Sequence, residues 1–174
     1  EADRQAKQSE YDATYTAYRA AVDETNAHRL NALGLFLGTG SGYNLGGSAT
    51  RLHGIIMLTR MLGEEDAALS FDGPCSFSDV AAGKPSAYTG YAFAQGYTTG
   101  VSATTFNPGG TLSFKHYVTF LLRALGYDDG AGDFTFAASW DKAVEIGMMT
   151  RASADCILQK QYALYRGDLV DLSV

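Results

Sequence analysis

Apolar residues recur at helical spacing along most of the chain. Tyr11, Tyr15, Tyr18 and Val22 lie three or four positions apart, which predicts an amphipathic helix within residues 1–33. The same spacing predicts shorter helices, each ended by a glycine, over residues 51–62, 88–95, 115–125 and 140–146, and a last one beginning at Leu169. The segments between them are rich in Gly, Ser and Asp, and residues 64–87 are predicted to be loop. Strand signals are weak, so the pattern predicts a mostly α fold with long Gly-rich loops.

An internal repeat underlies this pattern. Gly34, Gly96 and Gly147 each follow a short predicted helix, and in the first two cases a second glycine, Gly38 or Gly100, comes four residues later. A loop then leads to another helix in each copy. Agreement at so many ordered positions indicates three copies of a helix–Gly–loop–helix unit.

The second helices of the copies begin and end alike. They open with Thr50-Arg51, Ser113-Phe114 and Tyr165-Arg166, and the first two end in Leu-x-Arg-x-Leu-Gly. An aromatic residue, Tyr43 or Phe106, precedes the first two openings by seven positions. The predicted organisation is a lead-in helix and three units forming one body, with these bounds: 1–26, 27–75, 76–133 and 134–174.

The motifs resemble those of the S-layer homology (SLH) domain, of the Gram-positive, clostridial type. The second copy carries Phe77-Ser78-Asp79-Val80, Phe106-Asn107-Pro108 and Leu122-Arg123-Ala124-Leu125-Gly126, and the resemblance covers residues 27–174. It implies a pseudo-threefold arrangement, with a central three-helix bundle of second helices and three prongs of first helices. It also implies that grooves between the prongs bind secondary cell-wall polysaccharide, often pyruvylated, and tether a secreted protein to the cell wall.

The chain departs from the family pattern at several places. Phe114 stands where the family has arginine, and His53 and His116 stand where it has glutamate. The first copy lacks Phe-x-Asp-Val, and the last helix is short for a bundle unless the native chain continues beyond Val174. Whether the middle groove binds ligand therefore stays open.

Two arginines are the leading candidates for ligand binding. Arg51 and Arg166 fall in a first helical turn, where the helix dipole disfavours a cation by about 0.3–1 kcal/mol. A helix N-terminus, loop N–H groups and a guanidinium fork together suit a carboxylate or phosphate. Pairing of each arginine with a nearby carboxylate is the alternative. Thr50 would cap the helix, and Gly38 and Gly100 would let loop backbone approach the ligand.

Aromatic and acidic side chains complete the candidate site. Trp140 and Tyr88 lie on predicted prong helices and could stack on the apolar face of a sugar ring. Asp79 is a candidate either to cap its turn or to bond a sugar hydroxyl.

Composition narrows the function classes. There are 13 Lys and Arg against 19 Asp and Glu, a net charge of −6, which disfavours nucleic acid and anionic membrane surfaces as general partners. No apolar run approaches the roughly 20 residues of a membrane span. The chain begins at Glu1, so we expect a processed piece of an exported protein. Cys75 and Cys156 form no CxxC motif, and a disulfide and two free thiols remain equally open.

No pattern of catalytic or cofactor-binding residues is complete. Gly38-Thr39-Gly40-Ser41-Gly42 lacks the third glycine of a dinucleotide loop, the three histidines have no metal-ligand spacing, and no GxSxG elbow occurs. We therefore predict a non-catalytic wall-anchoring module with no cofactor or metal. The alternative is a protein-interaction or assembly domain on the same scaffold, with degenerate glycan sites and self-association through the N-terminal helix. A hydrolase would need a paired-carboxylate cleft, which the sequence does not indicate.

Overall fold

The computed structural model describes residues 21–22, 24–159 and 164–174, with backbone only at 156–159. The tyrosine stripe at Tyr11, Tyr15 and Tyr18, and with it the predicted self-association helix, lies outside the described residues. The chain divides into two compact units, one formed by residues 1–47 and 165–174 and the other by residues 48–164. Each unit is described by itself.

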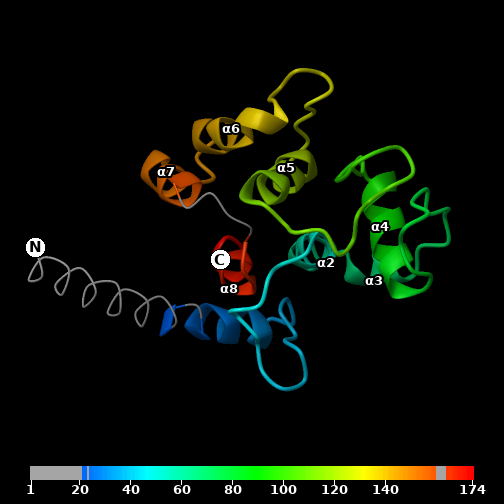
Figure 1. The fold of residues 1–174 in the computed structure, drawn as a ribbon, viewed down its shortest axis with the longest axis horizontal. Helices are drawn as coiled ribbons and strands as arrows, with labels where there is room; N and C mark the ends of the chain where they lie inside the picture. The colour runs from blue at the N-terminus through cyan, green and yellow to red at the C-terminus, as the bar shows by residue number, and fades with distance from the viewer. Residues whose placement is uncertain (1–20, 23, 160–163) are drawn as a thin grey trace, which may run out of the picture. The chain divides into compact units, whose positions relative to one another are not determined.

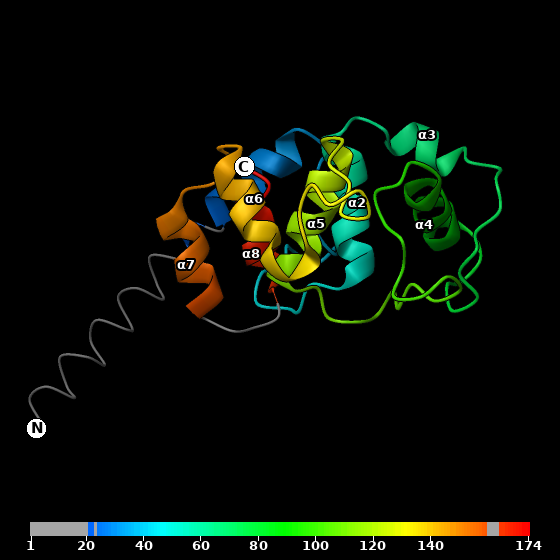
Figure 2. The ribbon, with the colours of Figure 1, turned by 90° about the horizontal axis from the view of Figure 1, so that it is seen from above.

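The larger unit is built on two central helices. α2 (Arg51–Met61) packs against α5 (Phe114–Ala124), as both ribbon views show (Figures 1 and 2). α3 and α4 pack beside α2, while the 3₁₀ helix η1, α6 and α7 follow α5. The bounds of these further elements are α3 Glu65–Leu69, α4 Lys84–Ala94, η1 Phe136–Ala138, α6 Ser139–Glu145 and α7 Arg151–Gln159.

A glycine lets the two central helices approach closely. A Cβ added at Gly54 of α2 would lie 2.9 Å from Cδ2 of Leu112, a core residue just before α5. Ile55 on α2 and Tyr117 on α5 are fully buried in this region. Both helices were predicted from their apolar spacing, and their apolar faces are buried in this region.

The helices predicted over residues 51–62, 88–95, 115–125 and 140–146 are confirmed, and the helix predicted within residues 1–33 is confirmed only over its described part. Two α-helices and a 3₁₀ helix that were not predicted also occur among the described residues. Gly63, Gly96, Gly126 and Gly147 end their helices with left-handed backbone, at φ between +72° and +91°. The prediction of loop over residues 64–87 is wrong in part, because α3 lies there and α4 begins at Lys84. Asp66 lies in the first turn of α3, and Pro85 suits that of α4.

No helix was predicted where α7 lies. Its start is stabilised by Thr150, whose Oγ1 accepts the N–H of Ser153 at 3.1 Å. In the described residues no strand is formed, so the mostly α class is confirmed.

Three main-chain hydrogen bonds close a ring within the larger unit. The N–H of Ala49 donates to the carbonyl of Leu164 at 2.8 Å, that of Leu112 to Ala49 at 2.9 Å, and that of Leu164 to Leu112 at 2.8 Å. All three residues are buried. In the sequence each stands two positions before the first residue of a second helix, so equivalent positions of the three predicted copies meet here.

The smaller unit joins the two ends of the described chain. Residues 24–32 form a helix that ends at Gly34, and α8 (Arg166–Asp171) packs near it, with Asn26 Nδ2 donating to Asp171 Oδ1 at 2.8 Å. Ala27, Leu30 and Leu169 are buried. The first helix agrees with the prediction over its described part, while α8 begins at Arg166, earlier than the predicted start at Leu169.

The structure also bears on membrane-spanning helices and on the state of the cysteines. None of the described helices combines the length and apolar character needed to cross a membrane. Cys75 is a free thiol, and the side chain of Cys156 lies outside the description.

Candidate anion-binding site

The same loop geometry is built at two helix starts, once in each unit. At the start of α2 the first two N–H groups donate to carbonyls of the Phe106–Gly110 loop, and at the start of α8 they donate to carbonyls of the Tyr43–Gly47 loop. The bonds are Arg51 N to Gly110 O (2.9 Å), Leu52 N to Pro108 O (3.2 Å), Arg166 N to Gly47 O (2.8 Å) and Gly167 N to Leu45 O (3.0 Å). The loop carbonyls therefore satisfy the N–H groups that a helix start leaves unpaired.

Each arginine is bonded to the aromatic residue that leads its loop. Arg51 donates its Nε–H to the carbonyl of Phe106 at 2.8 Å, and Arg166 donates to that of Tyr43 at 3.1 Å. Phe114, at the equivalent place on α5, is buried. The helix start of the middle copy thus carries no guanidinium.

Arg51 is a deeply buried cation. The residue is 3% exposed, its Cζ lies 4.8 Å from the ring centroid of Phe106 and 5.5 Å from that of Phe120, and its Nη2 is buried with no hydrogen-bond partner. Burial lowers the pKa of Arg51, the charge of Arg123 lowers it further, and Asp79 raises it. Among the described residues no carboxylate lies within ion-pair distance of Arg51, so the alternative of a simple intramolecular ion pair is not met there.

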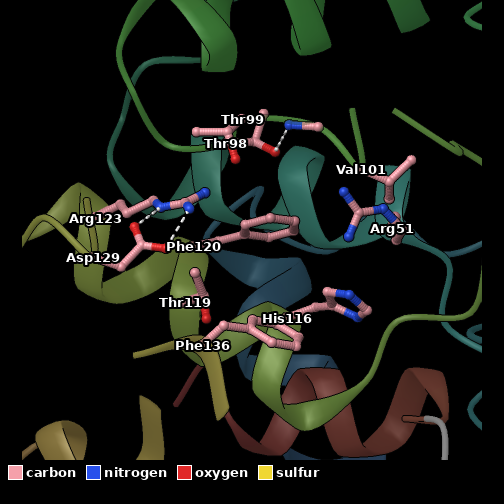
Figure 3. A pocket seen from close by; sticks show the side chains of 11 residues that line it. Arg51, Thr98, Thr99, Val101, His116, Thr119, Phe120, Arg123, Asp129 and Phe136 are labelled. Atoms are coloured by element: carbon pink, nitrogen blue, oxygen red, sulfur yellow. Dashed lines mark hydrogen bonds and ion pairs between the residues drawn. The ribbon is translucent and has the colours of Figure 1, made fainter. Parts of the chain in front are cut away.

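The guanidinium of Arg51 faces a cavity of about 300 Å³ in the larger unit. Figure 3 shows Arg51 and Arg123 on opposite sides of this cavity, with the ring of Phe120 between them. The lining is completed by polar and apolar groups from the 98–101 loop, α5 and the segment after it: Thr98, Thr99, Gly100, Val101, His116, Thr119, Asp129 and Phe136. The hydroxyl of Thr119 is buried without a partner. Arg51 and Thr119 therefore line the same cavity, and each has a buried polar atom without a hydrogen-bond partner.

Arg123 is held by a two-bond ion pair. Its Nε and Nη2 donate to the two carboxylate oxygens of Asp129 at 2.8 and 2.7 Å. These hydrogen bonds hold the pKa of Asp129 below its usual range. With Arg51, Arg123 and Asp129 charged and His116 neutral, the lining carries one net positive charge.

Histidines take the place of the usual carboxylate in two capping boxes. At the start of α2, Thr50 Oγ1 accepts the N–H of His53, and His53 Nδ1 accepts the N–H of Thr50 at 3.1 Å. Ser113 and His116 make the same pair of bonds at the start of α5. A ring nitrogen can therefore replace the carboxylate that the sequence lacks.

Several predicted site residues gather around Arg51. Gly100 lines the cavity, with φ at +78°, and a Cβ there would lie 2.5 Å from the carbonyl oxygen of Ser102. Thr50 caps α2, as expected. Asp79 accepts the N–H groups of Phe106 and Asn107 at 2.9 and 2.7 Å, which fastens the loop and holds the pKa of Asp79 below its usual value.

Arg166 and Gly38 lie together in the smaller unit. Arg166 is 8% exposed, its Cζ lies 4.9 Å from the ring centroid of Phe36, and burial lowers its pKa. A Cβ at Gly38 would lie 2.8 Å from the carbonyl oxygen of Gly42 and 3.3 Å from the ring of Tyr43. Gly38 is therefore required by its own loop, next to the residue that Arg166 bonds.

The two aromatic candidates do not line the Arg51 cavity. Tyr88 is 3% exposed and donates its hydroxyl to Glu65, and burial together with this bond raises the pKa of Tyr88 to about 12. Its ring has no open face for a sugar, so the expectation that it stacks is corrected. Trp140 is half-buried, and Nζ of Lys115 lies 4.6 Å from its ring centroid.

Among the residues that line the cavity, sequence reasoning singled out only Arg51 and Gly100, and it missed the others, including His116, Thr119 and Arg123. A signal existed for Arg123, since the motif Leu-x-Arg-x-Leu-Gly is followed within a few residues by an acid in both copies. The structure forms the ion pair in each case, Arg60 with Glu65 and Arg123 with Asp129. No comparable signal marks Thr119.

The described residues hold no cluster of three or more His, Cys, Asp or Glu side chains that could bind a metal ion. No protein-family model matches the chain, and no curated protein matches it.

Proposed function

We propose that this chain is a non-catalytic module that holds an exported protein on the cell wall by binding an anionic, pyruvylated secondary wall polysaccharide. The observation that carries this proposal is the buried guanidinium of Arg51, a residue that lines a cavity of about 300 Å³ and whose Nη2 has no hydrogen-bond partner among the described residues. A buried cation with an unpaired donor is unfavourable in the empty state, and an anion in the cavity would stabilise it.

The other lining groups suit an acidic sugar. Arg123 supplies a second cation, and the exposed Thr99 supplies a hydroxyl group for hydrogen bonding. Phe136 is 43% exposed and offers an apolar ring face beside these polar groups. A charged pyranose presents an acidic group, hydroxyl groups and an apolar C–H face, which match the cationic, hydroxyl and aromatic groups of the lining.

A pseudo-threefold body with a central three-helix bundle is part of the proposal. The closed ring of bonds among Ala49, Leu112 and Leu164 supports it, because a cyclic set of equivalent contacts is the signature of rotational repetition. The equivalent hydrogen bonds from the first two N–H groups of α2 and of α8 to loop carbonyls support it further, as do the SLH-like motifs.

Co-sedimentation with purified wall sacculi tests the function. The wild-type chain should pellet with intact sacculi and remain in solution with sacculi stripped of secondary polymer. Arg51→Gln should lose most of the pelleting, since it removes the cavity's unpaired cation while keeping a polar side chain. Arg151→Gln is the matched control, because it removes one charge from an exposed ion pair with Asp141. Equal pelleting in all of these cases would refute the proposal.

A further inference from the structure

His116 takes part in a capping box and also lines the Arg51 cavity. Its Nδ1 lies 3.4 Å from the backbone N of Ser113 and 2.8 Å from Ser113 Oγ. A main-chain N–H can only donate, so Nδ1 accepts in this arrangement and carries no proton. The proton of the neutral ring is then on Nε2, which has no hydrogen-bond partner among the described residues.

The charges that face His116 come from three side chains. Arg51 on α2 has no carboxylate partner among the described residues and bonds only a main-chain carbonyl there, whereas Arg123 on α5 is bonded to Asp129. The 98–101 loop and Phe136, whose ring centroid lies 5.1 Å from that of His116, bring no charge. Burial and the nearby charge of Arg51 lower the pKa of His116 to about 4, so the ring is neutral at neutral pH.

We propose that His116 contacts the bound anion and links its binding to proton uptake: the anion lies between Arg51 and Nε2–H of His116, and in mildly acidic solution a proton from solvent adds to Nδ1. This inference rests on the proposed anion-binding function. The capping box can accommodate the added proton, because the new Nδ1–H can donate to Ser113 Oγ at the 2.8 Å already present.

The anion reverses the electrostatic balance at His116. In the empty cavity Arg51 repels a proton on the ring, while a bound anion screens Arg51 and attracts that proton. An opposite charge within about 4–6 Å raises such a pKa by roughly 1–3 units. Because linkage is reciprocal, the anion must then bind more tightly wherever the bound state carries the extra proton.

Sulfate is a suitable probe, since it stays fully ionised in the working range and any change in affinity reports the protein. Calorimetric titration of the full chain should show binding about tenfold tighter near pH 5 than near pH 7.5, as a rise of about two units in the pKa of His116 requires. Titrations in two buffers of different ionisation enthalpy should show close to one proton taken up near pH 5.

Two equivalent histidines provide a matched pair of variants. His116→Gln keeps an acceptor at the third helical position but cannot titrate, so its affinity should not change with pH. His53→Gln makes the same change in the equivalent capping box, outside the residues that line the cavity, and should keep the wild-type pH dependence. The same pH dependence in His116→Gln as in wild type, or a flat wild-type profile with clear binding, would overturn this inference alone.

A second measurement does not depend on the variants. In NMR titrations of the wild-type histidine rings, saturating sulfate should raise the pKa of His116 by a unit or more, and an unchanged pKa would refute the proton link. Glucuronate, a sugar that carries a carboxylate, serves as a second probe. If neither sulfate nor glucuronate binds at any pH, and Arg51→Gln pellets with wall sacculi as the wild type does, the proposed function fails and this inference fails with it.

Discussion

Arg166, which is only 8% exposed, donates its Nε–H to the backbone carbonyl of Tyr43 at 3.1 Å. The contact spans most of the chain in sequence and ties α8 to the loop after the first described helix. The flat guanidinium also lies 4.9 Å from the centroid of the Phe36 ring. An arginine is required here for its shape as well as its charge.

Replacing Arg166 by lysine should therefore destabilise the smaller unit. Lysine keeps the charge but cannot lie flat on Phe36 while donating to Tyr43, and the loss of both contacts should lower the free energy of unfolding by about 1–2 kcal/mol. Urea denaturation followed by circular dichroism measures this. Arg29→Lys is the control, because Arg29 is exposed and its side chain bonds only Asn26, at 3.4 Å, among the residues that the structure describes. Equal stability of both variants would contradict the structural role of Arg166.

Stability should fall in acid partly because of His116. Its pKa is about 4 in the folded protein against about 6.5 in the unfolded chain, so the unfolded state binds more protons between these values. The stabilisation is complete above about pH 6.5 and is lost as the pH falls toward 4. His116→Gln should remove on the order of 1–2 kcal/mol of this pH dependence, allowing for partial exposure.

Chemical denaturation near pH 7.5 and near pH 4.5 measures the change. His28→Gln is the control, since His28 is exposed and lies outside both capping boxes. An identical loss of stability in acid for wild type and His116→Gln would show that the ring does not titrate in the capping box.

The sequence predicted the helices because their signals are local. Apolar spacing and a stopping glycine mark α2 and α5 without reference to the rest of the chain. α3 is only Glu65–Leu69, and α7 is polar on average and is followed by no stopping glycine, so both depend on the helices against which they pack.

The candidate site was predictable only in part, for a physical reason. Arg51 could be singled out because a cation in a first helical turn is unusual for local electrostatic reasons. The cavity brings α2, the 98–101 loop and α5 together, and such long-range contacts leave no spacing rule in the sequence. The histidine capping boxes were missed because the motif is usually recognised by its carboxylate, whereas the structure needs only an acceptor.

The backbone of the 98–101 loop should tolerate no side chain at Gly100. Gly96 and Gly100 have nearly the same left-handed φ, +79° and +78°, so alanine at either position carries the same backbone penalty of about 1 kcal/mol. Only at Gly100 would the Cβ also collide with the carbonyl oxygens of Ser102 and Thr105, at 2.5 and 2.7 Å.

Gly100→Ala should therefore be less stable than Gly96→Ala by about 1–3 kcal/mol, the usual range for a forced steric overlap. It should also weaken sulfate binding, because the loop that lines the cavity has to move. Thermal denaturation and calorimetric titration of the two variants provide the comparison. Equal stability and equal affinity would mean that the loop relaxes freely around the new methyl group.

The ion pair between Arg123 and Asp129 should limit anion affinity. Both carboxylate oxygens of Asp129 accept hydrogen bonds from Arg123, so the positive charge of Arg123 is largely neutralised before an anion binds. Asp129→Asn would leave one acceptor for Arg123, add one net positive charge to the lining, and tighten sulfate binding near pH 7.5 by about three- to tenfold. Asp141→Asn, which breaks an exposed pair with Arg151, should leave the affinity within twofold of wild type, about 0.4 kcal/mol. Weaker binding by Asp129→Asn would instead mean that the carboxylate holds Arg123 in the orientation that the ligand needs.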